Sequence, residues 1–185
     1  MTDPHFFGYG SLVNAATHDY PDAVPARLRG WRRVWRNTTL RDVAFLSVVS
    51  DGCSEIDGLV ARVPGADWQA LDAREWGYQR HDVSTLVDPR LPVEVYAVPE
   101  ENWNPNTARP KLLLRYIDVV VQGFLRVFGE AGVARFFETT AGWEALVLDD
   151  RAVPRYPRHQ PLSAAETALV DGWLSRVGAE KVVSD

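Results

Sequence analysis

Residues 5–12 read HFFGYGSL, and this stretch sets the start of the fold. Its apolar beginning predicts a β-strand. Two glycines then flank Tyr9, and this pattern predicts a tight turn, because glycine adopts backbone conformations that other residues disfavour. Successive N–H groups in a turn can form a concavity suited to an anion. The stretch therefore predicts either an ordinary turn or a backbone cradle that holds a ligand.

The composition limits the class of protein. Of the 185 residues, 46% are hydrophobic and 24% are charged, as is typical of a globular protein, and the length predicts one domain over residues 1–185. The net charge of −5 argues against nucleic acid or an anionic membrane surface as the main partner, and no apolar run has the length of a membrane span. Cys53 is the only cysteine, so no internal disulfide is possible. Because signal-peptide features are also missing at the start, we expect a cytoplasmic protein.

The first half of the chain carries mostly strand patterns. VAFLSVV (43–49) is a short apolar run closed by Asp51 and Gly52, and EIDGLVARV (55–63) alternates apolar and polar residues. We expect strands at 5–9, 26–37, 43–49, 55–63, 78–87 and 93–98.

Helix patterns interrupt and follow these strands. Asp67 is the expected N-cap of the first helix and Gly77 its expected end. Ser163 begins the last helix, with Glu166 three residues on, as in a capping box. We expect helices at 67–77, 111–128, about 130–139 and 163–177.

A proline-punctuated arm, LDDRAVPRYPRHQPL (148–162), precedes the last helix and resists regular structure. It is a packing strap, a lid edge near the site or a dimer contact. Strands first and helices later indicate an α+β fold, with a small, partly closed sheet and helices on its outside. The expected core covers about residues 5–145, followed by the arm and the terminal helix 163–177.

Glu75 stands at an unexpected position in the first helix. On a 3.6-residue period it shares one stripe with Trp68 and Leu71, which are large and apolar. Burial disfavours the charged form of a carboxyl group and raises its pKa, as a general acid/base at neutral pH requires. Three interpretations remain: a catalytic glutamate, an ion pair with an arginine such as Arg74 or Arg80, and a helix rotated so that Glu75 meets solvent.

Three segments together resemble the γ-glutamylcyclotransferase superfamily, including its ChaC-like and AIG2-like branches. They are FGYGSLV (7–13), LDAREWGYQRHDV (71–83) and, less specifically, RPKLLLRYIDVVVQG (109–123). The resemblance covers roughly residues 5–125 and implies a small mixed, partly closed β-sheet or barrel surrounded by helices. The arm has no assigned role in that family.

The resemblance also implies site residues. In the family a Tyr-Gly-Ser turn follows the first strand, which matches Tyr9-Gly10-Ser11-Leu12, although the Asn-Leu variant of this turn is missing. The catalytic glutamate falls on Glu75, and the tyrosine that follows it falls on Tyr78. A later helix brings a second tyrosine with glycine seven residues on, as in Tyr116 and Gly123.

The implied reaction is an intramolecular aminolysis of a small-molecule γ-glutamyl substrate that forms 5-oxoproline. It needs no metal or cofactor, because nucleophile and electrophile belong to one molecule. Glu75 would move the proton, and the backbone of Gly10, Ser11 and Leu12 would hold the substrate α-carboxylate. Two interpretations remain for each of three tyrosines: contact with the substrate, or packing with a satisfied hydroxyl. These residues are Tyr9, Tyr78 and Tyr116.

Other features carry weaker hypotheses. RLRGWRRVWR (27–36) alternates basic and aromatic residues as nucleic-acid platforms do, but its arginines are more simply stacked over Trp31 and Trp35 or paired with carboxylates. A non-catalytic binding module for a small acidic ligand or a protein partner is the main alternative to an enzyme. Substrate preference would reside in the segments 14–25, 101–110 and 148–162. The histidines, His5, His18, His81 and His159, have no metal-ligand spacing, so we expect no metal site.

Overall fold

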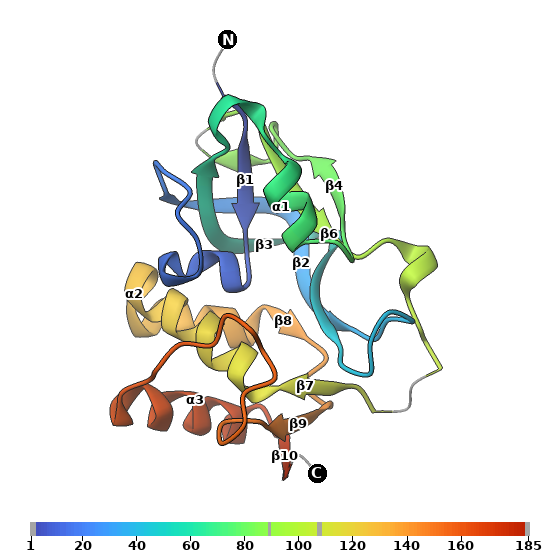
Figure 1. The fold of residues 1–185 in the computed structure, drawn as a ribbon, viewed down its shortest axis with the longest axis vertical. Coiled ribbons are helices and arrows are strands. Elements are labelled where there is room, and N and C mark those ends of the chain that lie inside the picture. Colours follow the sequence, from blue (N-terminus) through green and yellow to red (C-terminus); the bar gives the residue numbers. More distant parts are fainter. Residues whose placement is uncertain (1–2, 89, 107–108, 184–185) are drawn as a thin grey trace.

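The computed structural model describes residues 3–88, 90–106 and 109–183, and its largest element is a seven-stranded sheet (Figure 1). The strand order is β4-β6-β1-β3-β2-β5, and β8 pairs with β2 outside this path. The pairs β1–β6 and β2–β8 are parallel, and the other pairs are antiparallel. The strands are β1 (His5–Gly8), β2 (Val24–Arg36), β3 (Phe45–Arg62), β4 (Gln79–Asp82), β5 (Val87–Asp88), β6 (Val93–Ala97) and β8 (Thr140–Ala141).

A second, smaller sheet of three parallel strands closes the other end of the molecule. Its order is β10-β9-β7, with β7 at Lys111–Leu113, β9 at Leu146–Asp149 and β10 at Glu180–Val183. In the described residues the α-helices are α1 (Gln69–Arg74), α2 (Leu114–Glu138) and α3 (Ala164–Arg176). Figure 1 shows α1 beside β1 and β6, whereas α2 and α3 lie together near the small sheet.

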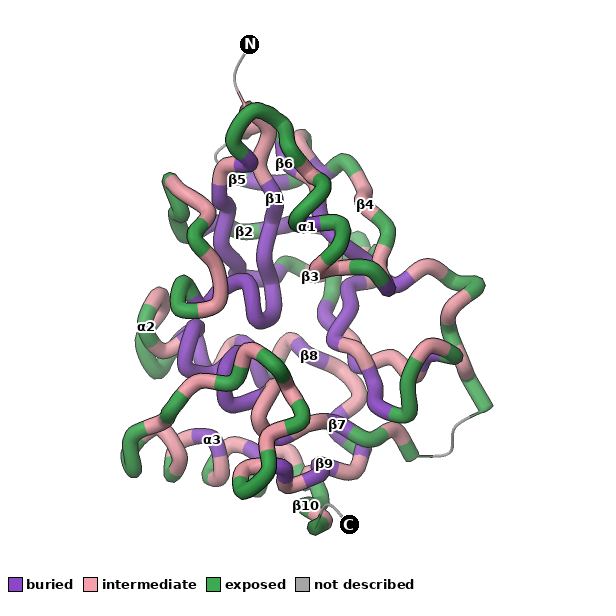
Figure 2. Tube along the Cα trace, viewed as in Figure 1, coloured by how far each residue is buried: buried purple, intermediate pink, exposed green. Residues whose placement is uncertain are grey.

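The larger sheet curls into a half-barrel, and the three helices pack around it. This arrangement confirms the predicted α+β fold with a mixed, partly closed sheet. Figure 2 shows the burial concentrated in β1, in the strands beside it and in the first part of α2. The first turns of α2 are buried on nearly every side, as in a helix that runs through a core.

One long strand replaces two predicted ones. The predicted turn at Asp51 and Gly52 is wrong, because β3 continues through it. Arg29 pairs with Glu55 and Trp31 pairs with Ser50, so four residues, 51–54, lie opposite the single residue Gly30. Gly30 has a φ of 75°, as an irregularity of this kind requires.

This bulge reverses the inward face of β2. Before Gly30 the buried residues are Ala26 and Leu28; after it they are Arg33 and Trp35. A side chain moves to the opposite face of a sheet when the strand shifts by one residue. The bulge therefore directs an arginine, Arg33, into the core.

The first helix is shorter than predicted. Trp68 occupies the N-cap position instead of Asp67, although the Asp67 carboxylate still accepts a hydrogen bond from the Gln69 N–H at 3.1 Å. The helix ends with Glu75 at its C-cap rather than at Gly77. A turn follows, in which the Tyr78 N–H donates to the Glu75 carbonyl at 2.8 Å.

The later helices follow the predictions with two changes. Residues 111–113 form β7 instead of helix, because they pair with β9. The predicted break between 111–128 and 130–139 is confirmed by a kink at Gly129, where φ is 67°. The capping box of α3 is also confirmed, since Ser163 and Glu166 exchange both hydrogen bonds. No described helix has the length and apolarity to cross a membrane.

Candidate functional site

The turn after β1 is packed tightly against α2. Gly10 leaves no room for a side chain, because a Cβ there would lie 2.6 Å from the Tyr116 hydroxyl. Backbone hydrogen bonds from Val13 to Gly10 (3.0 Å) and from Asn14 to Ser11 (3.1 Å) close the turn. The predicted tight turn is therefore present, and Gly10 allows the turn to lie close to Tyr116.

Asn14 fastens this turn to α2. Its side-chain amide donates to the Val119 carbonyl and to Gln122 Oε1, both at 3.0 Å. A Cβ at Gly123 would lie 2.8 Å from the Asn14 backbone nitrogen. Gly123 thus permits the contact that holds the turn against the helix.

Arg33 supports the turn from inside the fold and was missed in the sequence. Its Nε donates to the Tyr9 carbonyl at 3.0 Å, Nη1 donates to Thr139 Oγ1 at 2.9 Å, and Nη2 donates to the Asp57 carbonyl. Burial lowers its pKa to about 9, and the nearby Asp57 carboxylate opposes that change. The one available signal was Gly30, since a glycine inside a strand pattern suggests a bulge.

Glu75 lies at the end of α1 with its side chain 16% exposed. Burial raises the pKa of Glu75, because removal of water disfavours its ionised form. Arg74, with Nε 3.1 Å from Glu75 Oε1, and the charge of Arg158 oppose this rise. The catalytic and ion-pair interpretations thus meet in one geometry: Glu75 pairs with Arg74 and also lines a cavity.

Arg74 joins the glutamate to the segment that follows the turn. Its Nη1 donates to the Thr17 carbonyl at 2.9 Å, and Nη2 donates to Thr17 Oγ1 at 3.2 Å and to Ser11 Oγ at 3.3 Å. Only 8% of its side chain is exposed. The guanidinium therefore fixes the position of Glu75 relative to Ser11.

The three predicted tyrosines reach the same region in different ways. The Tyr9 hydroxyl donates to the Tyr96 carbonyl at 2.7 Å, and the Tyr78 hydroxyl donates to the Leu46 carbonyl at 2.9 Å. Both hydroxyls are thus engaged with the backbone, as the packing interpretation expects. Tyr116 presses its hydroxyl against Gly10, and burial raises its pKa.

A cavity of about 260 Å³ brings most of these groups together. A smaller recess of about 20 Å³ adjoins it along Gly8–Leu12. Glu75, Tyr78 and Tyr116 line both spaces, and Gly10 and Leu12 line the recess. The rest of the cavity is bounded by α1, β3 and the arm; these lining residues are Trp35, Arg41, Val43, Ala44, Phe45, Leu46, Ala73, Arg74, Trp76, Gly77, Leu113, Tyr156, Pro157 and Arg158.

The arm is fastened in place and forms one wall of the cavity. The Asp150 carboxylate accepts from the backbone N–H of Arg115, in the first turn of α2, at 2.8 Å and from that of Arg155 at 2.9 Å. Tyr156 packs edge-on against Tyr116, with ring centroids 5.1 Å apart. The arm is thus both a strap and an edge of the site.

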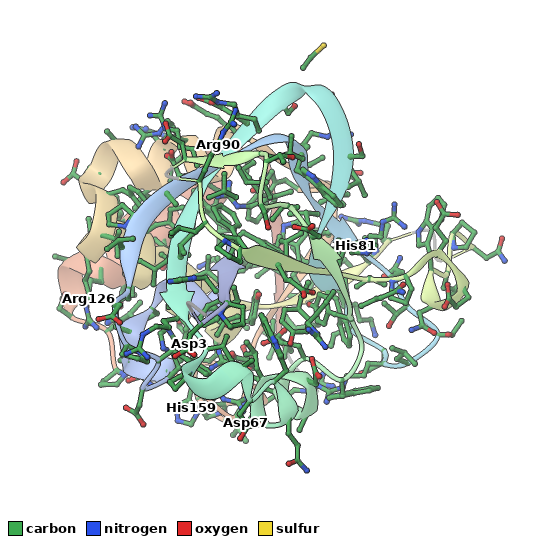
Figure 3. All side chains as sticks on the ribbon, turned by 90° about the horizontal axis from the view of Figure 1, so that it is seen from above. Asp3, Asp67, His81, Arg90, Arg126 and His159 are labelled. Carbon is green, nitrogen blue, oxygen red and sulfur yellow. The ribbon has the colours of Figure 1, made fainter. Side chains whose placement is uncertain are left out.

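The histidines lie apart from one another. Figure 3 shows His81 and His159 on different sides of the molecule. His81 packs against Trp31 with ring centroids 5.8 Å apart and does not line the cavity. Within the described ranges, no group of three His, Cys, Asp or Glu residues is placed to hold a metal ion.

The arginines of β2 are largely paired. Arg27 and Arg29 contact Glu55, and Arg27 also contacts Asp57 at 3.1 Å. Arg36 stacks over Trp103, with its guanidinium carbon 4.6 Å from the ring centroid. The basic strand 27–36 thus meets carboxylates, as the simpler interpretation expects, while its stacking partner is a tryptophan outside the strand.

Solved structures with this fold include three informative ones. YkqA from Bacillus subtilis is 18% identical with a TM-score of 0.59; the match covers 75% of this chain and 54% of YkqA, so the chain spans about half of YkqA. A gamma-glutamyl cyclotransferase is 14% identical with a TM-score of 0.56, covering 92% of this chain and 99% of that one. A human structure described as uncharacterized protein loc79017 is 15% identical with a TM-score of 0.57 and the same coverage.

These likenesses show that the chain shares the fold of these structures. Residues 6–113 match the family model described as gamma-glutamyl cyclotransferase, AIG2-like. The chain belongs to this family, since the match covers more than half of its 185 residues. No curated protein sequence matches the chain.

Proposed function

We propose that the protein is a cofactor-independent γ-glutamylcyclotransferase that converts a γ-glutamyl peptide or amine to 5-oxoproline and a free amine. The observation that carries this proposal is the position of Glu75, which lines both the recess at Gly8–Leu12 and the wider cavity. A substrate that spans the two spaces would place its reacting bond beside this carboxylate.

The chemistry needs only groups that the chain supplies. The substrate's α-amino nitrogen attacks its own γ-carbonyl carbon, a new C–N bond closes the five-membered ring, and the original amide C–N bond breaks. Glu75 takes a proton from the attacking nitrogen and returns it to the departing one. A carboxyl group with a raised pKa suits both halves of this transfer.

Positioning supplies much of the expected rate. Ring closure requires a folded substrate, and holding reacting atoms together can remove most of the entropic barrier. The backbone of Gly10, Ser11 and Leu12 would hold the α-carboxylate in the recess. Because Arg74 contacts both Ser11 and Glu75, it keeps the anion-binding turn and the proton carrier at a constant separation.

The test is 5-oxoproline release from a panel of γ-glutamyl compounds, with Glu75→Gln beside the wild type. We expect the variant to lose about 10²–10⁴-fold in kcat, the usual contribution of a general acid/base. Glu130→Gln, at an exposed position on α2, is the matched control and should keep full activity. Equal turnover by Glu75→Gln and wild type would exclude this mechanism.

One observation favours a second candidate, a binding module of the same fold. The 3.1 Å contact with Arg74 gives Glu75 a structural partner that a non-catalytic protein would also use. Such a module would release no 5-oxoproline from any substrate in the panel and would still bind a small acidic ligand, measurable by calorimetry.

A further inference from the structure

The cavity has two ends, and Glu75 stands where they join. Residues shared by the recess and the wider space include Ser11, Glu75 and Tyr116. Beyond this junction the wider space is bounded by groups that the recess lacks, among them Arg41 and Arg158. A γ-glutamyl group with its α-carboxylate at the recess would therefore extend its leaving amine toward the two arginines.

Arg41 and Arg158 differ from most arginines near them. Arg155, three residues before Arg158, pairs with Asp42 at 3.2 Å, and Arg74 pairs with Glu75. Among the described residues, neither Arg41 nor Arg158 has a carboxylate within ion-pair distance. Both positive charges thus line the cavity without a direct ion pair from the described residues, and Arg158 acts on Glu75 at longer range.

The two guanidinium groups have different surroundings. Arg41 lies over Trp76, with 5.0 Å between the guanidinium carbon and the ring centroid, and near Phe45 at 5.8 Å. Arg158 follows Tyr156 and Pro157 in the fastened part of the arm, and its charge acts on the pKa of Glu75. Arg41 is exposed and Arg158 is partly buried, and both line the cavity.

We infer that Arg41 and Arg158 bind a carboxylate on the leaving amine and so select amino-acid or peptide leaving groups over simple amines. This inference rests on the proposed cyclotransferase function. The cavity carries three arginines and one glutamate, so the α-carboxylate of the γ-glutamyl group alone leaves an excess of positive charge. A second carboxylate balances it, and the planar guanidinium group matches carboxylate geometry with two parallel hydrogen bonds.

Selectivity between amino acids and simple amines distinguishes binding by the two arginines from binding by apolar side chains alone. Phe45, Trp76 and Tyr156 would accept the carbon skeleton of an amine and of an amino acid equally well. Only the arginines distinguish the two, because a carboxylate gains charge-assisted hydrogen bonds there that the uncharged amide of a simple amine cannot form. Net preference for a carboxylate thus reports on Arg41 and Arg158 directly.

The experiment uses matched substrates that differ only in this group: γ-glutamyl-phenylalanine and γ-glutamyl-phenethylamine, with γ-glutamyl-phenylalanine amide as a third. We expect wild type to favour the carboxylate by about tenfold or more in kcat/KM, mainly through KM. Arg41→Gln and Arg158→Gln should each reduce this ratio, and the double variant should bring it near one. The ratio is the readout because any change in the pKa of Glu75 affects all three substrates alike.

The control is Arg126→Gln, which removes the same charge from an exposed position on α2 that Figure 3 shows at the edge of the molecule. It should keep the wild-type ratio. Thermal unfolding verifies that each variant is folded, and rising salt should reduce the wild-type preference independently of any mutation. Equal kcat/KM for the matched pair in wild type would overturn the inference and leave the proposed function standing. Absence of 5-oxoproline from every substrate would overturn the proposed function and the inference with it.

Discussion

Glu75 and Asp118 are two carboxylates that lie beside arginines, and their surroundings differ. Asp118 has no exposed side-chain surface and accepts two hydrogen bonds from Arg151, at 2.6 and 2.9 Å. Arg115 lies 3.8 Å away, and Arg151 also binds Asp171. Glu75 has one arginine contact, at 3.1 Å, and borders a cavity.

The difference separates a carboxylate enclosed in an ion-pair network from one that borders a cavity. A bidentate arginine satisfies Asp118, and the two carboxylates around Arg151 raise the pKa of that guanidinium above its ordinary value. Burial raises the pKa of both carboxyl groups, and Asp118 has two hydrogen bonds from Arg151 against one arginine contact for Glu75. The loss of Asp118 should therefore cost more stability than the loss of Glu75, because it removes the bidentate partner of Arg151.

The largest expected effect is on stability at Asp118. Asp118→Asn weakens an ion pair whose carboxylate is fully buried and whose arginine is partly buried, and breaking a buried pair typically costs about 3–5 kcal/mol in the free energy of unfolding. For a chain of this length, Tm should fall by roughly 10 °C, measured by circular dichroism. Asp171→Asn is the control, because that side chain is 36% exposed and should cost much less. An unchanged Tm for Asp118→Asn would remove the basis of the comparison.

Arg74 gives the next largest effect, on both stability and pH dependence. Arg74→Gln removes hydrogen bonds to Thr17 and Ser11 in a nearly buried site, and we expect a loss of about 1–3 kcal/mol. Because Arg74 opposes the rise in the pKa of Glu75, its loss should move the acidic limb of the kcat/KM profile to higher pH. Arg80→Gln, which breaks the pair with Asp72, should leave that limb in place. An acidic limb that moved to lower pH would contradict the expectation that Arg74 lowers the pKa of Glu75.

A smaller effect is expected at Tyr78. Tyr78→Phe removes the hydrogen bond to the Leu46 carbonyl and should cost about 0.5–1.5 kcal/mol, with little change in kcat/KM. The matched variant is Tyr156→Phe. The Tyr156 hydroxyl has no hydrogen-bond partner among the described residues, so the stability of this variant should stay close to that of the wild type. A large fall in kcat for Tyr78→Phe, measured as 5-oxoproline release, would show that this hydroxyl contacts the substrate.

Local patterns account for what could be predicted from the sequence. The strand and turn at 5–12 and the inward place of Glu75 depend on residues close together in the chain, so periodicity and glycine positions were sufficient. The small sheet was missed because β7, β9 and β10 are short and acquire their pairing only from distant segments.

The arginines of the site escaped prediction for a similar reason. Arg33 faces the core only because the bulge at Gly30 reverses the inward face of β2. Arg158 reaches the cavity through an arm whose course is set by Asp150 and Tyr156, contacts that no periodic pattern encodes. The inward position of Glu75 could be predicted from the local sequence, whereas the charges around it depend on tertiary structure.

The smallest expected effect is the change in the free energy of unfolding of Glu75→Gln, and the sign of this change is informative. The folded-state pKa of Glu75 is raised, so ionised Glu75 destabilises the fold; this penalty is absent below the unfolded-state pKa and fully present above the folded-state pKa. Glu75→Gln should therefore be at least as stable as wild type, with a larger advantage at about pH 8 than at about pH 4. Urea unfolding at the two pH values measures this, and Glu130→Gln should show no such change. If Glu75→Gln were instead less stable at the higher pH, the bond to Arg74 would outweigh burial. Glu75 would then be a structural carboxylate held by its ion pair.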